Sequence, residues 1–169
     1  MNGEIKMNNI WFISDTHFNH ANIIKYCNRP FKDVDEMNQT IIHNWNSVVS
    51  DEDTVFFLGD FVLGKYEDFA NFTKVLKGHK HFIIGNHEHI SKEKILLAGF
   101  ESVYKKLLLK YEDKNLVLTH YPQEVENGEI CIYGHVHDKP VQLKSKSFCV
   151  CAECIGYTPI EIDEILRRV

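Results

Sequence analysis

Five short groups of residues that commonly bind metals punctuate this chain of 169 residues. Aspartate, asparagine and histidine side chains offer the oxygen and nitrogen atoms that divalent transition metals accept. Two ions held about 3.5–4 Å apart can bind phosphoryl oxygens and activate water, so the set predicts hydrolysis of a phosphate ester. In chain order the groups are Asp15-Thr16-His17, Gly59-Asp60, Gly85-Asn86-His87-Glu88, His120 and Gly134-His135-Val136-His137.

Each group directly follows a short apolar run. Runs of about four residues, rich in β-branched and aromatic side chains and ended by Gly, Asp or Asn, are typical of buried strands. Strands of an open α/β sheet bring their carboxyl ends to one edge, so we expect the five groups to meet there. The runs cover residues 10–13, 55–58, 82–84, 116–118 and 130–133.

The segments between these runs change character along the chain. Apolar residues recur at helical spacing over residues 37–49 and 67–76, and a shorter helix is expected over 92–98. Later, residues 107–111 and 115–119 flank a polar turn, and 147–151 reads as a further strand. The sequence therefore predicts an α/β half followed by a mainly β half.

Composition and charge restrict the function classes. A chain of this length fits one domain, here residues 1–169, and 44% hydrophobic with 25% charged residues is ordinary for a globular protein. The formal net charge of −5 disfavours long nucleic acid as a partner. Residues 1–9 lack the apolar core of a signal peptide, and no run approaches about 18 apolar residues, so we expect a cytoplasmic protein that does not engage membranes.

The five cysteines are expected to be free thiols in a reducing cytosol. Three of them, Cys149, Cys151 and Cys154, form a C-x-C-x-x-C pattern that could bind zinc. A buried strand is the stronger interpretation, because Phe148-Cys149-Val150-Cys151 is apolar, free cysteines are often buried, and no fourth ligand stands nearby.

The order and residue types of the five groups resemble those of the calcineurin-like metallophosphoesterase superfamily, whose pattern runs D-x-H, G-D, G-N-H-E, H and G-H-x-H. The resemblance spans Asp15 to His137. It implies a mixed α/β fold, a four-layer α/β/β/α sandwich in which helices flank two mixed sheets, and two divalent metal ions, with manganese expected first and iron, nickel or zinc as alternatives. It assigns one metal to Asp15, His17, Asp60 and His137, and the other to Asp60, Asn86, His120 and His135.

The resemblance also implies roles around these metals. Asp60 would bridge the two ions, His87 would contact the substrate phosphate and assist the leaving group, and Glu88 would hold the loop. The second group does not extend to the G-D-x-x-D-R-G of the superfamily's phosphoprotein phosphatases, because Leu63 and Gly64 stand where that pattern has its Asp and Arg. That departure disfavours a phosphoserine phosphatase and makes the chain look more like small bacterial and phage phosphoesterases.

A polar lip is expected beside the first group. Asn19, His20 and Arg29 are candidate substrate contacts there, and the planar fork of an arginine suits phosphate. The alternative is that these residues only cap a helix or bind solvent.

The sequence thus favours a dinuclear phosphoesterase acting on a small phosphorylated substrate, monoester or diester, including nucleotide-derived ones. A nuclease on short or single-stranded nucleic acid is the first alternative, although no aromatic and basic stripe is evident. The second is a non-catalytic scaffold, which is disfavoured because scaffolds of this fold lose metal ligands and this chain keeps the full set. Oligomeric state stays open.

Overall fold

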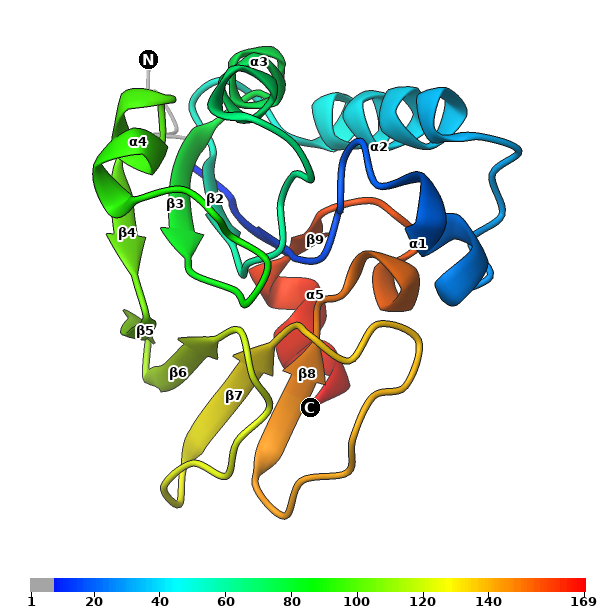
Figure 1. The fold of residues 1–169 in the computed structure, drawn as a ribbon. Coiled ribbons are helices and arrows are strands. Elements are labelled where there is room, and N and C mark those ends of the chain that lie inside the picture. The colour runs from blue at the N-terminus through cyan, green and yellow to red at the C-terminus, as the bar shows by residue number, and fades with distance from the viewer. Residues whose placement is uncertain (1–7) are drawn as a thin grey trace, which may run out of the picture.

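Two mixed β-sheets pack face to face in the computed structural model, which describes residues 8–169 (Figure 1). The first sheet has the order β4-β3-β2-β1-β9, in which only β9 is antiparallel to its neighbour. Its strands are β1 (Ile10–Ile13), β2 (Thr54–Phe57), β3 (His79–Ile83), β4 (Ser102–Tyr104) and β9 (Ile160–Glu161).

The second sheet has the order β5-β6-β7-β8. An antiparallel hairpin joins β5 to β6, whereas β6, β7 and β8 run parallel to one another. Its strands are β5 (Lys106–Tyr111), β6 (Lys114–Thr119), β7 (Glu129–Tyr133) and β8 (Lys146–Cys149).

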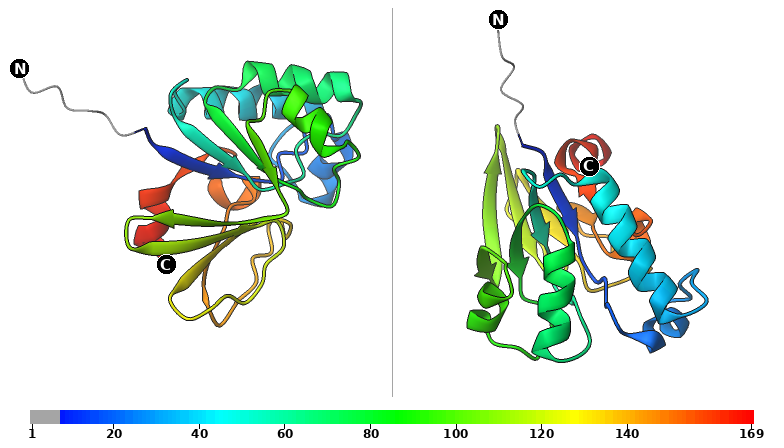
Figure 2. Two further views of the ribbon diagram at one scale, coloured as in Figure 1. Left: turned by 90° about the vertical axis from the view of Figure 1, so that its left-hand side faces the viewer. Right: turned by 90° about the horizontal axis from the view of Figure 1, so that it is seen from above.

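The helices are distributed unevenly about the two sheets. Helices α1 to α4 lie on the outer side of the first sheet, and α5 lies beside β1 and β9 (Figure 2). Loop residues Val125, Val136 and Leu143 pack on the outward side chains of β7 and β8. The helices are α1 (Ala21–Tyr26), α2 (Val34–Val48), α3 (Tyr66–Val75), α4 (Lys92–Leu97) and α5 (Ile162–Arg168), with a 3₁₀ turn at Ala152–Ile155.

Successive side chains along a strand point to opposite faces of the sheet and so contribute to two different hydrophobic cores. In β1, Ile13 faces the helices and joins the core that contains Trp45 of α2, while Phe12 faces the second sheet. Strands β6 and β7 supply Leu118 and Ile132 to the core between the sheets. Both faces of the first sheet are therefore buried, which explains why its strands read as continuous apolar runs.

The predicted fold class, a mixed α/β sandwich with two mixed sheets and flanking helices, is confirmed. The strands and helices expected from apolar patterning are present with boundaries shifted by a few residues, whereas α1, β4, β9 and α5 were not predicted. No helix within residues 8–169 has the length and apolar character needed to span a bilayer. The prediction that a signal peptide is lacking concerns residues 1–9, of which 1–7 lie outside the described residues.

Candidate metal centre

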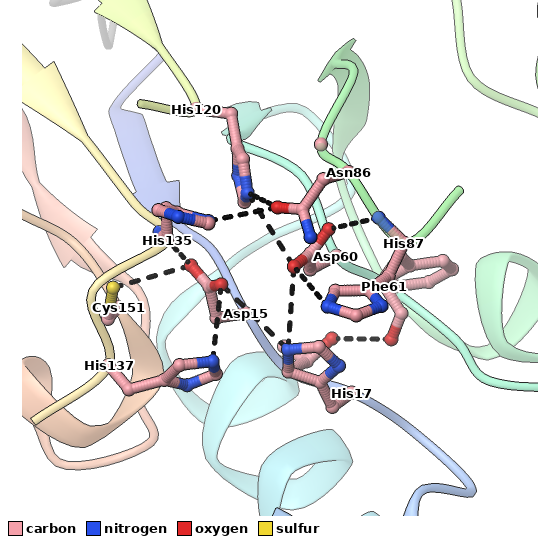
Figure 3. Close-up of polar contacts among 12 residues, drawn as sticks. Asp15, His17, Asp60, Phe61, Asn86, His87, His120, His135, His137 and Cys151 are labelled. Carbon is pink, nitrogen blue, oxygen red and sulfur yellow. Dashed lines mark hydrogen bonds and ion pairs between the residues drawn. The ribbon is translucent and has the colours of Figure 1, made fainter. Parts of the chain in front are cut away.

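The five groups meet where β1, β2, β3, β6 and β7 end, as Figure 3 shows. Asp15 follows β1 by two residues, Asp60 follows β2 by three and Asn86 follows β3 by three. The second sheet contributes His120 directly after β6 and His135 shortly after β7. Both sheets thus deliver polar side chains to the same point.

Backbone hydrogen bonds join the loop after β1 to the loop after β2. The amide of Asp15 donates to the carbonyl oxygen of Gly59 over 2.9 Å, and that of His17 donates to the carbonyl oxygen of Asp60 over 3.1 Å. Phe61, directly after Asp60, is fully buried and makes edge-to-face contacts with Phe57 and other rings. Its burial anchors the second loop in the helix-side core and so fixes the position of Asp60.

The backbone at the centre is held in an unusual conformation. Five of the predicted metal ligands have positive φ angles between 49° and 73°: Asp15, His17, Asp60, His135 and His137. A left-handed conformation costs an L-residue about 1–2 kcal/mol. Such strain concentrates at functional sites, where the surrounding structure holds it in place.

Gly134 allows the loop after β7 to approach the loop after β1 closely. A Cβ atom on Gly134 would lie 2.5 Å from Ser14 Oγ and 2.6 Å from Asp15 Oδ2. No other residue fits there without displacing the loop after β1, which explains the glycine that opens the last group.

Two clusters of potential ligands lie side by side. In the first, Asp15 Oδ1 is 3.9 Å from Nε2 of His17 and 4.0 Å from Nε2 of His137. The second cluster joins Asp60, His120 and His135. Asn86 Oδ1 belongs beside it, because it lies 2.9 Å from His120 Nε2 and 2.9 Å from His135 Nδ1.

Asp60 connects the two clusters. Its Oδ2 atom lies 3.6 Å from Nε2 of His17 and also 3.6 Å from Nε2 of His120. Its other oxygen, Oδ1, accepts a hydrogen bond from the backbone amide of His87 over 2.9 Å. One oxygen is therefore tied to the backbone and the other faces both clusters.

Asp15 is arranged in the same way. Its Oδ2 atom accepts hydrogen bonds from the His135 amide over 2.9 Å and from the Cys151 thiol over 3.3 Å. Its Oδ1 atom is buried without a hydrogen-bond partner in the described structure, and so is Nε2 of His17. Buried polar atoms normally have partners, so these two atoms are placed for a group that accepts their lone pairs.

The distances fit metal ions. Two ligand atoms that bind the same ion, each at about 2.1 Å, lie at most about 4.2 Å apart. The separations from Asp15 Oδ1 and Asp60 Oδ2 to the imidazole nitrogens, 3.6 to 4.0 Å, fall within that limit and are too long for hydrogen bonds. The residues present therefore match the divalent ions that their types and order predict.

Supporting hydrogen bonds orient two of the imidazoles. His120 Nδ1 lies 2.7 Å from the carbonyl oxygen of Leu58, so Nδ1 carries the proton and Nε2 is free to bind. His137 Nδ1 lies 3.0 Å from Glu153 Oε1, with the same consequence for its Nε2.

Burial perturbs the charges at the centre. Burial, together with the neighbouring His137 and Arg29, lowers the pKa of His17 to about 2, so its imidazole is neutral at physiological pH. Burial also raises the pKa of Asp15, which expresses the cost of an anion in this environment. A nearby cation would remove that cost.

His87 and Glu88 occupy different environments although they are adjacent. The His87 side chain is 53% exposed, and its Nε2 atom lies 3.9 Å from Asp60 Oδ2 at the mouth of the centre. Glu88 is half-buried and accepts hydrogen bonds from the backbone amides of Phe61 and Gly85, at 3.0 and 2.5 Å. Burial and the Asp60 charge raise the pKa of Glu88 to about 8. Glu88 therefore ties the loop after β3 to the loop after β2.

Two of the three predicted lip residues lie at the rim. The ring of His20 is 5.4 Å from that of His17, and its Nδ1 atom is buried without a partner in the described structure. Asn19 is exposed, but its Oδ1 atom accepts a hydrogen bond from Asn38 over 2.9 Å. His20 is thus the better placed of the two to meet a substrate.

The third lip residue, Arg29, is not at the surface, and its prediction as a substrate contact is wrong. Its side chain is fully buried and pairs with Glu153 at 2.7 and 2.9 Å. It also donates to the backbone carbonyl oxygens of Thr16 and Asp15, at 2.8 and 2.7 Å. The sequence could not reveal this, because the residues around Arg29 are the same whether its side chain points toward solvent or into the core.

Glu153 was not singled out from the sequence. It lies in the 3₁₀ turn after β8, and its side chain is only 5% exposed. A signal existed, since a lone carboxylate among small apolar residues from Phe148 to Ile155 must find a partner if that segment is buried.

The three clustered cysteines lie beside the centre. Cys149 ends β8 and is buried, as the strand interpretation predicts. The Cys151 thiol donates to Asp15 Oδ2, and the Cys154 thiol donates to the carbonyl oxygen of His137 over 3.0 Å. Within residues 8–169, no three-ligand cluster is made of these cysteines.

Comparison with known proteins identifies the family. The family model of the calcineurin-like phosphoesterase superfamily domain matches residues 8–152. An uncharacterized protein of Methanocaldococcus jannaschii, MJ1445, is 42% identical over 173 residues, which cover 98% of this chain and 93% of that protein.

Two solved structures are similar in fold. The Aquifex aeolicus protein AQ665, of unknown function, superposes with a TM-score of 0.81 at 27% identity, covering 96% of this chain and all of that one. YfcE, a phosphoesterase from E. coli, has a TM-score of 0.52 at 16% identity and covers 90% of this chain and 81% of its own. Together with the paired Asp/His clusters, the domain match shows that this chain belongs to the calcineurin-like phosphoesterase superfamily of metal-dependent phosphoester hydrolases.

Proposed function

We propose that this protein is a dinuclear metal-dependent hydrolase of small phosphate esters. The observation that carries the proposal is the position of Asp60 Oδ2, which lies 3.6 Å from Nε2 of both His17 and His120. These two imidazoles belong to different clusters, which supports a site in which one carboxylate oxygen would be shared by two ions.

The ligand sets follow from the clusters. Asp15, His17, Asp60 and His137 would hold the first ion, and Asp60, Asn86, His120 and His135 the second. Both sets mix oxygen with imidazole nitrogen, which suits manganese and also admits iron, nickel or zinc. When bound, a pair of ions supplies an activated water and stabilises the charge that develops on the phosphoryl oxygens.

The protein contributes further steps through its own side chains. His87, half exposed beside Asp60, would donate a proton to the oxygen of the leaving group as the ester bond breaks. His20, whose ring lies 5.4 Å from that of His17, would donate a hydrogen bond to the substrate at the rim. The fixed loops hold the ligands in place before substrate arrives, which removes reorganisation from the reaction.

A small substrate is favoured over a long polymer. The formal net charge of −5 provides no general attraction for a phosphate backbone. One observation supports a nuclease as the second candidate: Tyr121 is 49% exposed and the centroid of its ring lies 4.6 Å from that of His135, where a nucleobase could stack.

The test uses chelator-stripped protein reloaded with manganese and an aryl phosphodiester beside its monoester. We expect turnover to return with metal and to fall at least about 100-fold in Asn86→Ala and in His135→Ala at limiting metal. His43→Ala, which removes an exposed imidazole from α2, is the matched control and should retain full activity.

Three outcomes would contradict parts of the proposal. Near wild-type turnover in the Asn86 or His135 variants would refute the ligand assignment. Turnover of an oligonucleotide with steep salt dependence, at the expense of both aryl esters, would favour the nuclease. No turnover of any ester in protein that holds two ions would indicate a binding role.

A further inference from the structure

Glu153 stands at the centre of a buried network behind the first metal cluster. Its Oε1 atom lies 3.0 Å from His137 Nδ1 and accepts hydrogen bonds from Arg29 Nε and Nη2, at 2.9 and 2.7 Å. The side chains of Glu153 and Arg29 are 5% and 0% exposed. All of these contacts use Oε1, and the second oxygen, Oε2, is buried without a hydrogen-bond partner in the described structure.

Arg29 extends the network to the other side of the cluster. Its guanidinium also donates to the backbone carbonyl oxygens of Asp15 and Thr16, in the loop that carries two of the proposed ligands. One chain of hydrogen bonds therefore runs from the backbone of Asp15 through Arg29 and Glu153 to the ring of His137. The two halves of the first cluster come from opposite sheets, and this chain joins them.

We propose that Glu153, held by Arg29, is a positioning residue that fixes the ring and tautomer of His137 so that Nε2 faces Asp15 and binds the first metal. The inference rests on the proposed two-metal site. Because Nδ1–H donates a hydrogen bond to Glu153, only Nε2 keeps a free lone pair, and that atom lies 4.0 Å from Asp15 Oδ1.

A third metal site is the competing interpretation. Cys27, His137 and Glu153 also bring one potential ligand atom each within 4.8 Å of the others. Two observations disfavour it: the positively charged Arg29 guanidinium already lies 2.7 Å from Glu153 Oε1 and would repel a cation there, and the Nδ1 atom of His137 is already bonded to Glu153. The group is therefore a support for the first site.

The experiment titrates metal-free protein with manganese chloride by calorimetry. In Glu153→Gln we expect one of the two manganese equivalents to bind about 10–100-fold more weakly, while the other stays within about twofold of wild type. Glu52→Gln is the matched control, because it makes the same chemical change on an exposed residue just before β2, at the end of that strand away from the metal centre. This variant should bind both manganese equivalents with wild-type affinity.

A second readout needs no metal. The ¹⁵N shifts of the His137 ring in metal-free protein report which nitrogen carries the proton, and we expect Nδ1–H in the wild type. The double variant Arg29→Met/Glu153→Leu removes both buried charges together, avoids an unpaired one, and should give a mixture of tautomers. It also keeps the test decisive if Glu153→Gln fails to fold.

The inference and the proposed function fail separately. Wild-type affinity for both equivalents, with unchanged ring shifts in the variants, would overturn the role of Glu153 and leave the two-metal proposal standing. A third manganese equivalent that Cys27→Ser abolishes would make Glu153 a ligand and also overturn it. If wild type binds fewer than two equivalents, the two-metal proposal fails, and the ring shifts still decide whether Glu153 sets the tautomer.

Discussion

The left-handed backbone conformation of the candidate ligands predicts how glycine and alanine substitutions there change the free energy of unfolding. His135 has φ of 73°, a conformation that costs an L-residue about 1–2 kcal/mol and glycine almost nothing. Replacing His135 by glycine or by alanine removes the same imidazole, but only glycine relieves the backbone. The greater freedom of glycine in the unfolded chain offsets about 0.5–1 kcal/mol of that relief.

The two terms leave a net advantage for glycine. We expect metal-free His135→Gly to be more stable than His135→Ala by about 0.5–1 kcal/mol, whereas glycine is the less stable choice at ordinary positions. Urea unfolding of metal-free protein measures this difference without interference from lost metal binding.

Asp138 provides the matched control in the same loop. It is exposed, and its φ lies outside the left-handed region. There, Asp138→Gly should be less stable than Asp138→Ala by about 0.5–1 kcal/mol. The reasoning is refuted if alanine is equal to or better than glycine at both positions.

Three further predictions concern the same centre. Saturating manganese at about 100 times its Kd should stabilise the protein by about 2.7 kcal/mol, a rise in Tm of about 5–10 °C that a chelator reverses; an unchanged Tm would contradict metal binding. Gly134→Ala should lower kcat/KM about 100-fold, because its Cβ would lie 2.6 Å from Asp15 Oδ2; kinetics equal to wild type would show that the loops can separate freely. In metal-free protein, His17 has a pKa of about 2 against about 6.5 unfolded, so its stabilising contribution is complete above pH 6.5 and is lost as pH falls. Between pH 6.5 and 5, wild type should lose about 2 kcal/mol more than His17→Asn in urea titrations, and parallel losses would refute the assignment.

The sequence predicted the structure best where a buried strand is followed directly by potential metal ligands. Strands such as β1 and β7 are buried on both faces, so their apolar runs stand out, and the polar groups after them mark the sheet edge. The short elements β4, β9 and α1 were not predicted, because a few residues are too short a stretch to show the hydrophobic periodicity of a strand or of a helix.

Orientation was the part that patterns could not supply. Arg29 was predicted to face the substrate, and the structure buries it against Glu153, which is 124 residues away in the chain. Nothing in the local sequence of either residue specifies that pairing, since it arises only when the turn after β8 packs behind the loop after β1. The support of the centre was therefore hidden, although its proposed ligands were readable.

Binding and turnover measured on the same samples test the central claim most directly. Metal-free protein would be titrated with manganese while bound metal and hydrolysis of an aryl phosphodiester or its monoester are followed together. A dinuclear centre bridged by Asp60 predicts activity that rises to its maximum at about two equivalents per chain and is abolished in Asp60→Asn. Full activity at one equivalent, or turnover that survives removal of metal, would contradict it.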